Sequence, residues 1–322
     1  MLKARDEKLQ RIVAVKTLAE PLAASGTARQ RFVREAIAAA AIRHENVVDI
    51  HAVDDGGPVP YLVMEFIDGR SLEARLRDAG SLELKELLRI GLQIAEGLAA
   101  AHKQGLIHRD VKPANILLEN GVPRVKITDF GLARTADDAS LTATGLIAGT
   151  PAFMSPEQAK GEAIDQRSDL FSLGSVLYAM CTGQSPFRGS TTLGVIKRVC
   201  EDEPTPIREL NADIPEWLCG IVKRLHAKRP DERYQTAAEV AEDLRRGLAL
   251  VQGGVPQPPI QEPASAIRAH GALGAPRRTV RRWLVPAVAT ALMLALTLTL
   301  TEAGGVTHLV PTVIRVVTGE GT

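Results

Sequence analysis

The sequence predicts an α+β protein of two lobes, in which a small sheet-containing lobe precedes a larger helical lobe. Residues 11–18 and 59–67 are rich in the β-branched and aromatic residues typical of strands. Between them, residues 27–43 repeat apolar side chains at helical spacing, and from Ser71 to about Leu250 the pattern is mostly helical. A chain of 322 residues, 45% of them apolar, is long enough for one large two-lobed domain followed by a tail.

The composition argues against several classes of protein. The formal net charge is only +1, so nothing in the charge indicates a nucleic-acid partner. The three cysteines, Cys181, Cys200 and Cys219, lie far apart without a CxxC pair, which favours free thiols in a reducing compartment over a zinc site or a disulfide framework. The first 16 residues mix charged and apolar side chains and lack the apolar core of a signal peptide.

The helical lobe is predicted to contain more than helices. Glycine punctuation separates two predicted helices, 71–79 and 82–104. Two short strand-like runs, 116–119 and 124–128, predict a small hairpin inside this lobe. Residues 216–248 are predicted to be helical again, and the domain is expected to end near residue 250.

Behind the predicted domain the chain changes character. Residues 251–282 are rich in Pro, Gly and Ala and predict a linker that ends in basic residues. Residues 283–300 carry no charge, and these eighteen residues as a helix would span about 27 Å, enough for the hydrocarbon core of a bilayer, so a transmembrane helix is expected over 283–301. A buried core helix is the alternative, although only about twenty residues follow that could cover it.

The distribution of basic residues predicts the orientation of this span. Four arginines directly precede it, and they are Arg277, Arg278, Arg281 and Arg282. Basic flanks stay on the cytoplasmic side. We therefore expect a single-pass protein of the cytoplasmic membrane, with residues 1–282 in the cytoplasm and a short extracytoplasmic tail over 302–322.

The most informative motif is HRDVKPAN at residues 108–115, followed by DFG at 129–131. Phosphoryl transfer needs a carboxylate that accepts a hydroxyl proton, oxygen ligands for a metal ion, and a cation near the moving phosphate. Asp110 can be the base, and Lys112 can neutralise charge on the γ-phosphate. Asn115 and Asp129 offer the hard oxygen ligands that Mg²⁺ prefers.

A second pair of charged residues lies upstream. Lys16 ends the strand motif VAVK, and Glu35 lies on the following predicted helix. A strand lysine held by a helix glutamate positions phosphates in this chemistry, although such a pair by itself could be purely structural. The order VAVK, helix Glu, HRDxKxxN and DFG is what makes phosphoryl transfer the preferred hypothesis.

With these motifs in this order, residues 1–250 resemble the eukaryotic-like (Hanks-type) serine/threonine protein kinases of bacteria. The resemblance implies the two-lobed protein-kinase fold, with ATP and Mg²⁺, or Mn²⁺ in its place, as cofactors. It implies that Lys16 contacts the α- and β-phosphates and pairs with Glu35. The remaining nucleotide contacts that it implies are Ala14 above the adenine, Leu117 below it, Met64 as gatekeeper, and the backbone of Glu65 and Ile67 at the hinge.

The resemblance also implies what the domain acts on. Lys112 and Thr150, which precedes Pro151, match the pattern of kinases that phosphorylate Ser or Thr of proteins, with Thr150 in the segment that binds the substrate. Thr142 and Thr144 stand where related kinases autophosphorylate, in trans within a possible homodimer, and Arg109 would pair with such a phosphate. The remaining matches, Asp169, Glu157 and Arg233, imply structural support of the catalytic and substrate-binding loops.

One departure from the family pattern leaves a second hypothesis open. The glycine-rich loop that covers the ATP phosphates would precede Met1, and residues 1–6 are predicted to be the middle of a strand, so we expect an N-terminally truncated domain with an open sheet edge. Residues 306–322 resemble the opening of a longer extracytoplasmic segment. The alternative function is therefore a pseudokinase or scaffold, a binding module with weak or no turnover.

Overall fold

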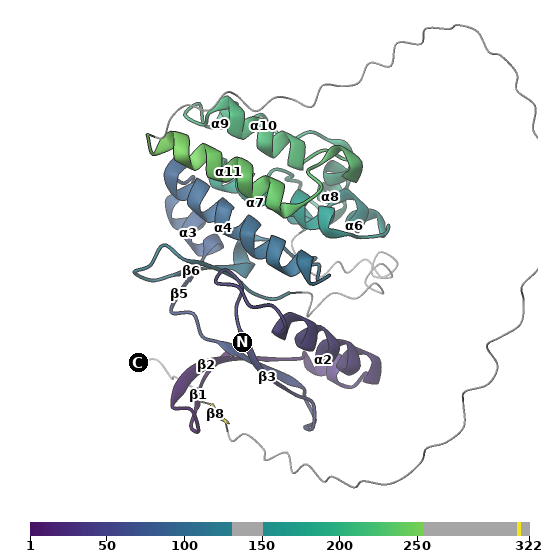
Figure 1. Cartoon of the computed structure of the whole chain (residues 1–322). Helices are drawn as coiled ribbons and strands as arrows, with labels where there is room; N and C mark the ends of the chain where they lie inside the picture. The colour runs from purple at the N-terminus through teal and green to yellow at the C-terminus, as the bar shows by residue number, and fades with distance from the viewer. Residues whose placement is uncertain (131–150, 254–313, 317–322) are drawn as a thin grey trace, which may run out of the picture. The chain divides into compact units, whose positions relative to one another are not determined.

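The structure is a computed structural model, and it describes residues 1–130, 151–253 and 314–316. A sheet with one long helix forms the small lobe, and a bundle of helices forms the large lobe, as Figure 1 shows. The two lobes belong to one compact unit, and the chain passes from one to the other between β4 (Tyr61–Glu65) and β5 (Gly69–Ser71). The predicted two-lobed α+β architecture is therefore confirmed.

The small lobe is built on an antiparallel five-stranded sheet with the order β3-β4-β2-β1-β8. The helices and strands of this lobe are β1 (Leu2–Asp6), β2 (Arg11–Thr17), α1 (Glu20–Ala23), α2 (Gly26–Ala40), β3 (Ile50–Asp54), β4 and the distant β8 (Ile314–Val316). The strands predicted over 11–18 and 59–67 correspond to β2 and β4, and the helix predicted over 27–43 corresponds to α2.

Strand β8 changes the expectation of an open edge at β1. It pairs antiparallel with β1, and Ala4 lies opposite Val316. Strand β8 thus covers the edge of β1 over three residue pairs. It belongs to the tail over 302–322, which was expected to lie outside the membrane. This pairing and a membrane span over 283–301 exclude each other, because a span would separate β8 from β1 by a bilayer.

Alternation along β2 determines which residues face α2. Val13 and Val15 pack on the sheet face away from α2, in a cluster with Ala4 and Val63. Side chains alternate across a strand, so Ala14 and Lys16 face the helix side. On the helix side, Ala14 belongs to a second apolar cluster. Phe32 and Ala36 of α2, spaced one helical turn apart, complete this cluster. This register brings Lys16 to the face where Glu35 is located.

The large lobe combines helices with a small three-stranded sheet of order β5-β6-β7. Its strands are β5, β6 (Ile116–Glu119) and β7 (Val125–Ile127), so the predicted hairpin is confirmed and gains a third strand. Its α-helices are α3 (Leu72–Ala79), α4 (Leu84–Lys103), α6 (Pro156–Lys160), α7 (Gln166–Thr182), α8 (Thr192–Glu201), α9 (Ile207–Leu210), α10 (Glu216–Leu225) and α11 (Ala237–Val251). Its short 3-10 helices are η1 (Pro113–Asn115), η3 (Pro151–Phe153) and η4 (Pro230–Glu232).

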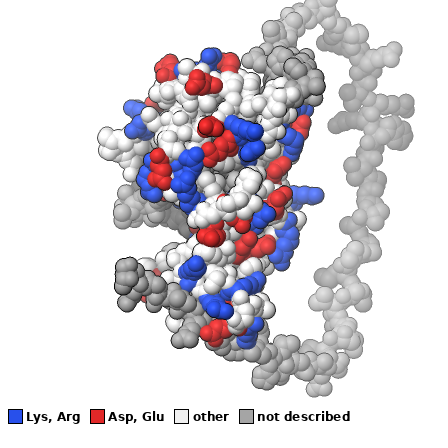
Figure 2. Space-filling view, turned by 90° about the vertical axis from the view of Figure 1, so that its left-hand side faces the viewer, with Lys and Arg blue, Asp and Glu red and all other residues white. Residues whose placement is uncertain are grey.

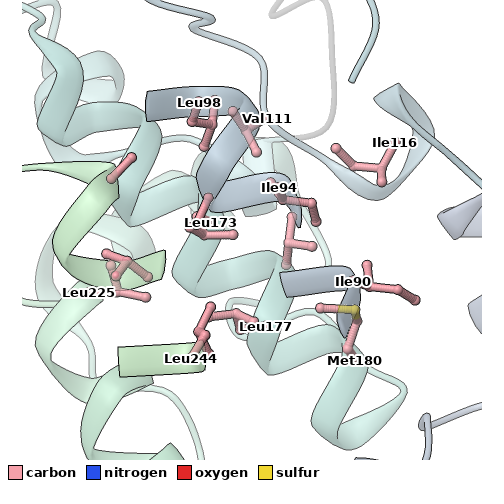
Figure 3. Packing of buried hydrophobic residues seen from close by; sticks show 14 of the residues in the cluster. Ile90, Ile94, Leu98, Val111, Ile116, Leu173, Leu177, Met180, Leu225 and Leu244 are labelled. Carbon is pink, nitrogen blue, oxygen red and sulfur yellow. The ribbon is translucent and has the colours of Figure 1, made fainter. Parts of the chain in front are cut away.

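The core of the large lobe lies between α4, α7, α10 and α11. Figure 3 shows Ile94, Leu173, Leu225 and Leu244 meeting there from these four helices. Two helices approach closely at Gly174, where a Cβ would lie 2.8 Å from the Cβ of Leu225. Any side chain at this position would push α7 and α10 apart, so the packing requires glycine.

The prediction of continuous helix over 216–248 was wrong in its middle. Helix α10 ends at Leu225 and α11 begins at Ala237, with the short η4 between them. Pro230 cannot continue a helix from the preceding turn, and the loop turns the buried Arg233 inward. The break between α10 and α11 therefore allows Arg233 to make a buried polar contact, which the local periodicity of the sequence does not reveal.

A short backbone connection joins the two lobes beside the hinge. Val48 donates its N–H to the carbonyl of Ile127 at 3.0 Å, and Ile127 donates to the carbonyl of Asn46 at 2.8 Å. The segment after α2 thus pairs with β7 of the large lobe. The two strand systems that flank the hinge are consequently held to each other by main-chain hydrogen bonds.

The surface of the described residues mixes both signs of charge. Figure 2 shows Lys and Arg interspersed with Asp and Glu over both lobes of the visible face. Within the described residues, no helix is both long and apolar enough to span a bilayer. Residues 283–301, where the span was expected, lie outside the described ranges.

Candidate active site

A lysine and an aspartate from opposite lobes meet between the two lobes. Lys16 of β2 places its ammonium nitrogen 2.8 Å from Oδ1 of Asp129, which follows β7. Asp129 has a φ of 67°, a conformation that few residues other than glycine adopt. Such strain persists where the surrounding structure imposes it and is typical of functional sites. The predicted strand lysine and DFG aspartate are thus in direct contact.

The predicted Lys16–Glu35 pair is not formed in this structure. The ion pair recorded for Glu35 is with Arg109, whose Nη1 lies 3.8 Å from Oε1 of Glu35. Burial raises the pKa of the Glu35 carboxyl even though three arginines nearby act to lower it. The correction has a physical reason: the tertiary structure places the Asp129 carboxylate against Lys16 and the Arg109 guanidinium nearest to Glu35.

Three predicted catalytic residues share one hydrogen-bonded cluster. Lys112 donates to Oδ2 of Asp110 at 2.7 Å, and Asn115 Nδ2 donates to the same oxygen at 3.0 Å. Asn115 also donates to the backbone carbonyl of Asp110 at 2.8 Å. Helix η1 carries Asn115 back towards Asp110, which explains why the two residues are separated by four intervening positions. The Asp110 carboxylate is therefore held in one orientation by two donors.

The catalytic loop is anchored to the large lobe by Asp169 of α7. Its carboxylate is almost fully buried and accepts the backbone N–H groups of His108 and Arg109, each at 2.8 Å. His102 of α4 hydrogen-bonds the same carboxylate through Nε2 at 2.8 Å. No motif in the sequence marks His102, and its contact with Asp169 is visible only in the tertiary structure.

His108 connects the catalytic loop to the strand that delivers Asp129. Its Nε2 lies 2.9 Å from the carbonyl oxygen of Thr128, and its ring lies 4.5 Å from that of Phe130. His108 is fully buried, so these contacts hold the main chain on both sides of Asp129. His108 therefore packs the HRD motif directly against the DFG motif.

The residues expected around the adenine lie on both sides of the hinge. Ala14 and Met64 are directly opposite each other on β2 and β4, and both are buried. Glu65 ends β4, Ile67 follows in the hinge, and Leu117 lies on β6 of the large lobe. These placements agree with the expected positions of Ala14 above the adenine and Leu117 below it. They also agree with Met64 as gatekeeper and with Glu65 and Ile67 at the hinge.

The donor set suits a hard divalent cation. Asn115 commits its amide nitrogen to Asp110, which leaves the amide oxygen as a ligand. Asp129 keeps Oδ2 beside the oxygen that Lys16 holds. Mg²⁺ is commonly bound by one or two protein oxygens together with substrate phosphates and water, so two such ligands are sufficient.

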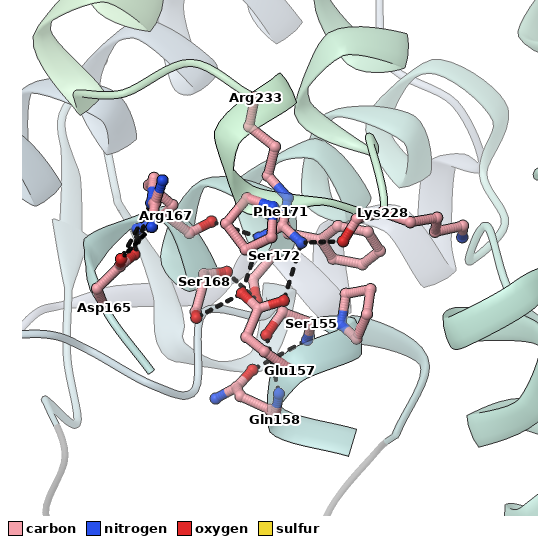
Figure 4. A network of polar contacts seen from close by, with 12 residues as sticks. Ser155, Glu157, Gln158, Asp165, Arg167, Ser168, Phe171, Ser172, Lys228 and Arg233 are labelled. Atoms are coloured by element: carbon pink, nitrogen blue, oxygen red, sulfur yellow. Dashed lines mark hydrogen bonds and ion pairs between the residues drawn. The ribbon is translucent and has the colours of Figure 1, made fainter. Parts of the chain in front are cut away.

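A buried ion pair joins α6 to the loop that precedes α11, as Figure 4 shows. Arg233 donates to both carboxylate oxygens of Glu157 at 2.8 Å, and Ser168 donates to the carboxylate at 2.6 Å. Burial alone would raise the pKa of the Glu157 carboxyl, but these hydrogen bonds and the arginine charge hold its pKa below the ordinary value. The implied contact between Glu157 and Arg233 is therefore present.

Some features lie outside this site. The expected phosphorylation sites Thr142 and Thr144 and the substrate-contacting Thr150 lie outside the described residues. Two cavities of about 460 and 400 Å³ also lie elsewhere, one beside His102 and Arg167 and the other beside Arg70 and the β6–β7 hairpin. The site is thus recognised by its residues and their contacts rather than by the size of a cavity.

A bilobal fold in which a strand lysine contacts the aspartate of the DFG motif, beside the hydrogen-bonded HRDxKxxN loop, is the arrangement of a phosphotransferase domain. The family model for the protein kinase domain matches residues 1–244. The chain therefore belongs to the protein kinase family.

Relatives specify the class within this family. The chain is 40% identical over 245 residues to a probable serine/threonine-protein kinase of Clostridium perfringens, which covers 76% of this chain and 36% of that protein. It is 41% identical over 262 residues to the serine/threonine-protein kinase PknB of Mycolicibacterium smegmatis. These residues make up 80% of this chain and 41% of that protein. The chain thus spans well under half the length of these relatives.

Solved structures agree with the fold. The kinase domain of PknI from Mycobacterium tuberculosis is 26% identical to this chain and superimposes with a TM-score of 0.59, over 73% of this chain and 85% of that one. Another structure of the same domain gives a TM-score of 0.60 over 76% of this chain. The domain is of the bacterial serine/threonine kinase class.

Proposed function

We propose that this chain transfers the γ-phosphate of ATP to serine or threonine residues of proteins. The observation that carries the proposal is that the Lys16–Asp129 pair lies beside the cluster of Asp110, Lys112 and Asn115. The backbone joins them, because Thr128, next to Asp129, donates its N–H to the carbonyl of Asn115 at 3.0 Å. These residues supply a phosphate-binding cation, metal ligands and a proton acceptor.

The roles follow from the contacts. Asp110 accepts the hydroxyl proton of the substrate, and Asn115 keeps its carboxylate aimed by donating to Oδ2. Lys112, already 2.7 Å from that oxygen, stabilises charge on the moving phosphate. A bound Mg²⁺ would be held by Asn115 and Asp129 and would offset the charge of the nucleotide phosphates. Lys16 keeps the Asp129 carboxylate in place and provides a positive charge for those phosphates.

We further propose that the chain regulates itself through Thr142 and Thr144, which a second copy of the chain would phosphorylate. The support is Arg109, whose side chain is partly exposed next to the catalytic Asp110 and is paired with Glu35 only at 3.8 Å. A phosphothreonine is a stronger partner for an arginine than a distant carboxylate. Moving Arg109 to such a phosphate would leave Glu35 available to Lys16.

The proposed activity is tested by comparing residues 1–322 with the same residues extended ahead of Met1 by a strand and a GxGxxG loop. Residues 1–322 contain no such segment beside a strand, and loop backbone amides would align the γ-phosphate. Because misplacement by about 1 Å can cost on the order of 10²-fold, we expect the extended chain to transfer phosphate about 10²-fold faster. The measurement is kcat/KM for Mg–ATP with a generic protein substrate.

Mass spectrometry of the same reactions should place new phosphate on Thr142 and Thr144. The added strand has to replace β8 beside β1, so the extended chain is also expected to release β8. Equal kcat/KM values in the two chains would contradict the role given to the loop. Activity in neither chain would favour the pseudokinase or scaffold function instead.

We propose in addition that residues 283–301 anchor the kinase domain to the cytoplasmic membrane. The proposal rests on an uncharged apolar run preceded by four arginines. In the anchored form β8 is separated from β1. Protease added to intact cells is then expected to spare residues 1–282 and to remove an epitope tag placed after Thr322.

The paired state of β8 provides the opposite outcome for this experiment. If β8 remains on β1, the tag stays protected in intact cells and becomes sensitive only after lysis. Release of the kinase domain as soluble protein without detergent would likewise overturn the anchor. A tag placed before Met1 serves as the matched control, because it should be protected in both cases.

A further inference from the structure

A buried lysine of the large lobe forms an ion pair with the residue that opens the hinge. Lys126 lies in the middle of β7, and its Nζ is 2.8 Å from Oε2 of Glu65, the last residue of β4. The Lys126 side chain is only 7% exposed, whereas that of Glu65 is 30% exposed. This pair crosses from one lobe to the other at the base of the nucleotide site.

The surroundings of the pair hold Glu65 from several directions. Oε2 of Glu65 accepts the backbone N–H of Asp49 at 3.3 Å, and the Glu65 N–H donates to the Asp49 carbonyl at 2.8 Å. Lys126 also donates to the carbonyl of Val47 at 3.4 Å. The lysine therefore joins β7, the segment after α2 and the end of β4 at one point.

The position of the Lys126–Glu65 pair connects it to the expected nucleotide site as well as to the stability of the fold. Glu65 directly precedes the hinge residues that lead to Ile67, and Lys126 of β7 lies three positions before Asp129, which follows that strand. The two ends of the expected nucleotide site, adenine at the hinge and phosphates at Asp129, are thus connected through one ion pair.

We propose that Lys126 is a positioning residue for nucleotide binding, a proposal that rests on the ATP-dependent function above. By holding the Glu65 carboxylate, it keeps the hinge peptide groups from Glu65 to Ile67 at the distance from Asp129 that adenine and phosphates require. Lys126 contacts no nucleotide atom itself. Its effect is on affinity for the adenine end of the ligand.

The test uses adenosine and ADP as probes, because adenosine reports on the hinge without any phosphate contact. Lys126→Met is expected to weaken adenosine binding by about tenfold in calorimetry, the effect of misaligning one hydrogen bond. The variant should still fold, because the partly exposed Glu65 carboxylate can be hydrated. Lys126→Arg retains the charge and is expected to restore most of the affinity.

Two further variants separate positioning from general destabilisation. Glu65→Gln should weaken adenosine binding to a similar extent, and combining it with Lys126→Met should add little, because both break one interaction. Arg245→Met, which removes the remote Arg245–Glu96 pair at 2.9 Å, is the matched control and should leave adenosine affinity unchanged. Steady-state kinetics should show a raised KM for ATP with kcat nearly unchanged.

Each other outcome overturns the proposal. Unchanged adenosine affinity in Lys126→Met and Glu65→Gln shows that the pair does not position the hinge. A higher kcat with unchanged KM shows instead that the pair restrains turnover. Absence of adenosine and ADP binding by the unmodified chain contradicts the proposed ATP-dependent function itself, and that result is visible before any variant is made.

Discussion

Replacing Asp110 with asparagine is expected to abolish phosphate transfer while leaving the fold intact. The side chain keeps its shape and can still accept hydrogen bonds from Lys112 and Asn115 through its amide oxygen. It can no longer take the hydroxyl proton, and general base assistance is worth about 10²- to 10⁴-fold in rate. Initial rates with Mg–ATP and a protein substrate, measured in the chain that carries a glycine-rich loop, check this expectation.

The control for this variant is Asp78→Asn, which makes the same chemical change at an exposed pair with Arg70. It should retain the parent rate. Nucleotide affinity of Asp110→Asn should also remain close to that of the parent, because Asp110 acts on the hydroxyl rather than on the nucleotide. If Asp110→Asn phosphorylated the substrate at the parent rate, another group would have to be the base.

Replacing Arg233 with methionine is expected to have the largest effect on stability. The arginine side chain is fully buried and binds both oxygens of Glu157, which is itself 5% exposed. Removing one partner leaves a buried carboxylate without its cation, which typically costs about 3–5 kcal/mol. The free energy of unfolding, measured with urea at neutral pH, should fall by that order.

Two comparisons check the cause of this loss. Arg246→Met, which removes an exposed pair with Glu242 on α11, should change stability very little. The lowered pKa of Glu157 means that its ionised form stabilises the fold above the unfolded pKa, and that this contribution is lost as pH falls through the folded value. The difference between the parent and Arg233→Met should therefore shrink in acid, and a constant difference would contradict the ion-pair explanation.

The elements that sequence periodicity predicted well are those whose burial repeats locally. Strand β2 alternates Val13 and Val15 with Ala14 and Lys16, and α2 repeats Phe32 and Ala36 at one-turn spacing. Such patterns can be recognised in the sequence without knowing which elements pack against them. The helix predicted over 216–248 was less accurate because the loop around Arg233 is stabilised by Glu157, which is 76 positions away in sequence.

The motif residues were also recognisable from the sequence, because phosphoryl transfer needs particular side chains at particular spacings. Asp110, Lys112 and Asn115 lie within six positions and contact one another across η1. His102 and Lys126 could not be recognised in the same way. Their partners, Asp169 and Glu65, are 67 and 61 positions distant, and no local pattern connects them.

The sequence by itself determined the two-lobed class and the kinase motifs, and it predicted which groups act on a phosphate. It could do so because strand alternation, helical spacing and short catalytic motifs are all local properties of a chain. The tertiary structure alone decided which carboxylate holds Lys16, which strand covers β1 and which residues support the hinge and the catalytic loop. These outcomes depend on distances between segments that are remote in sequence, and packing of the lobes, not local propensity, determines those distances.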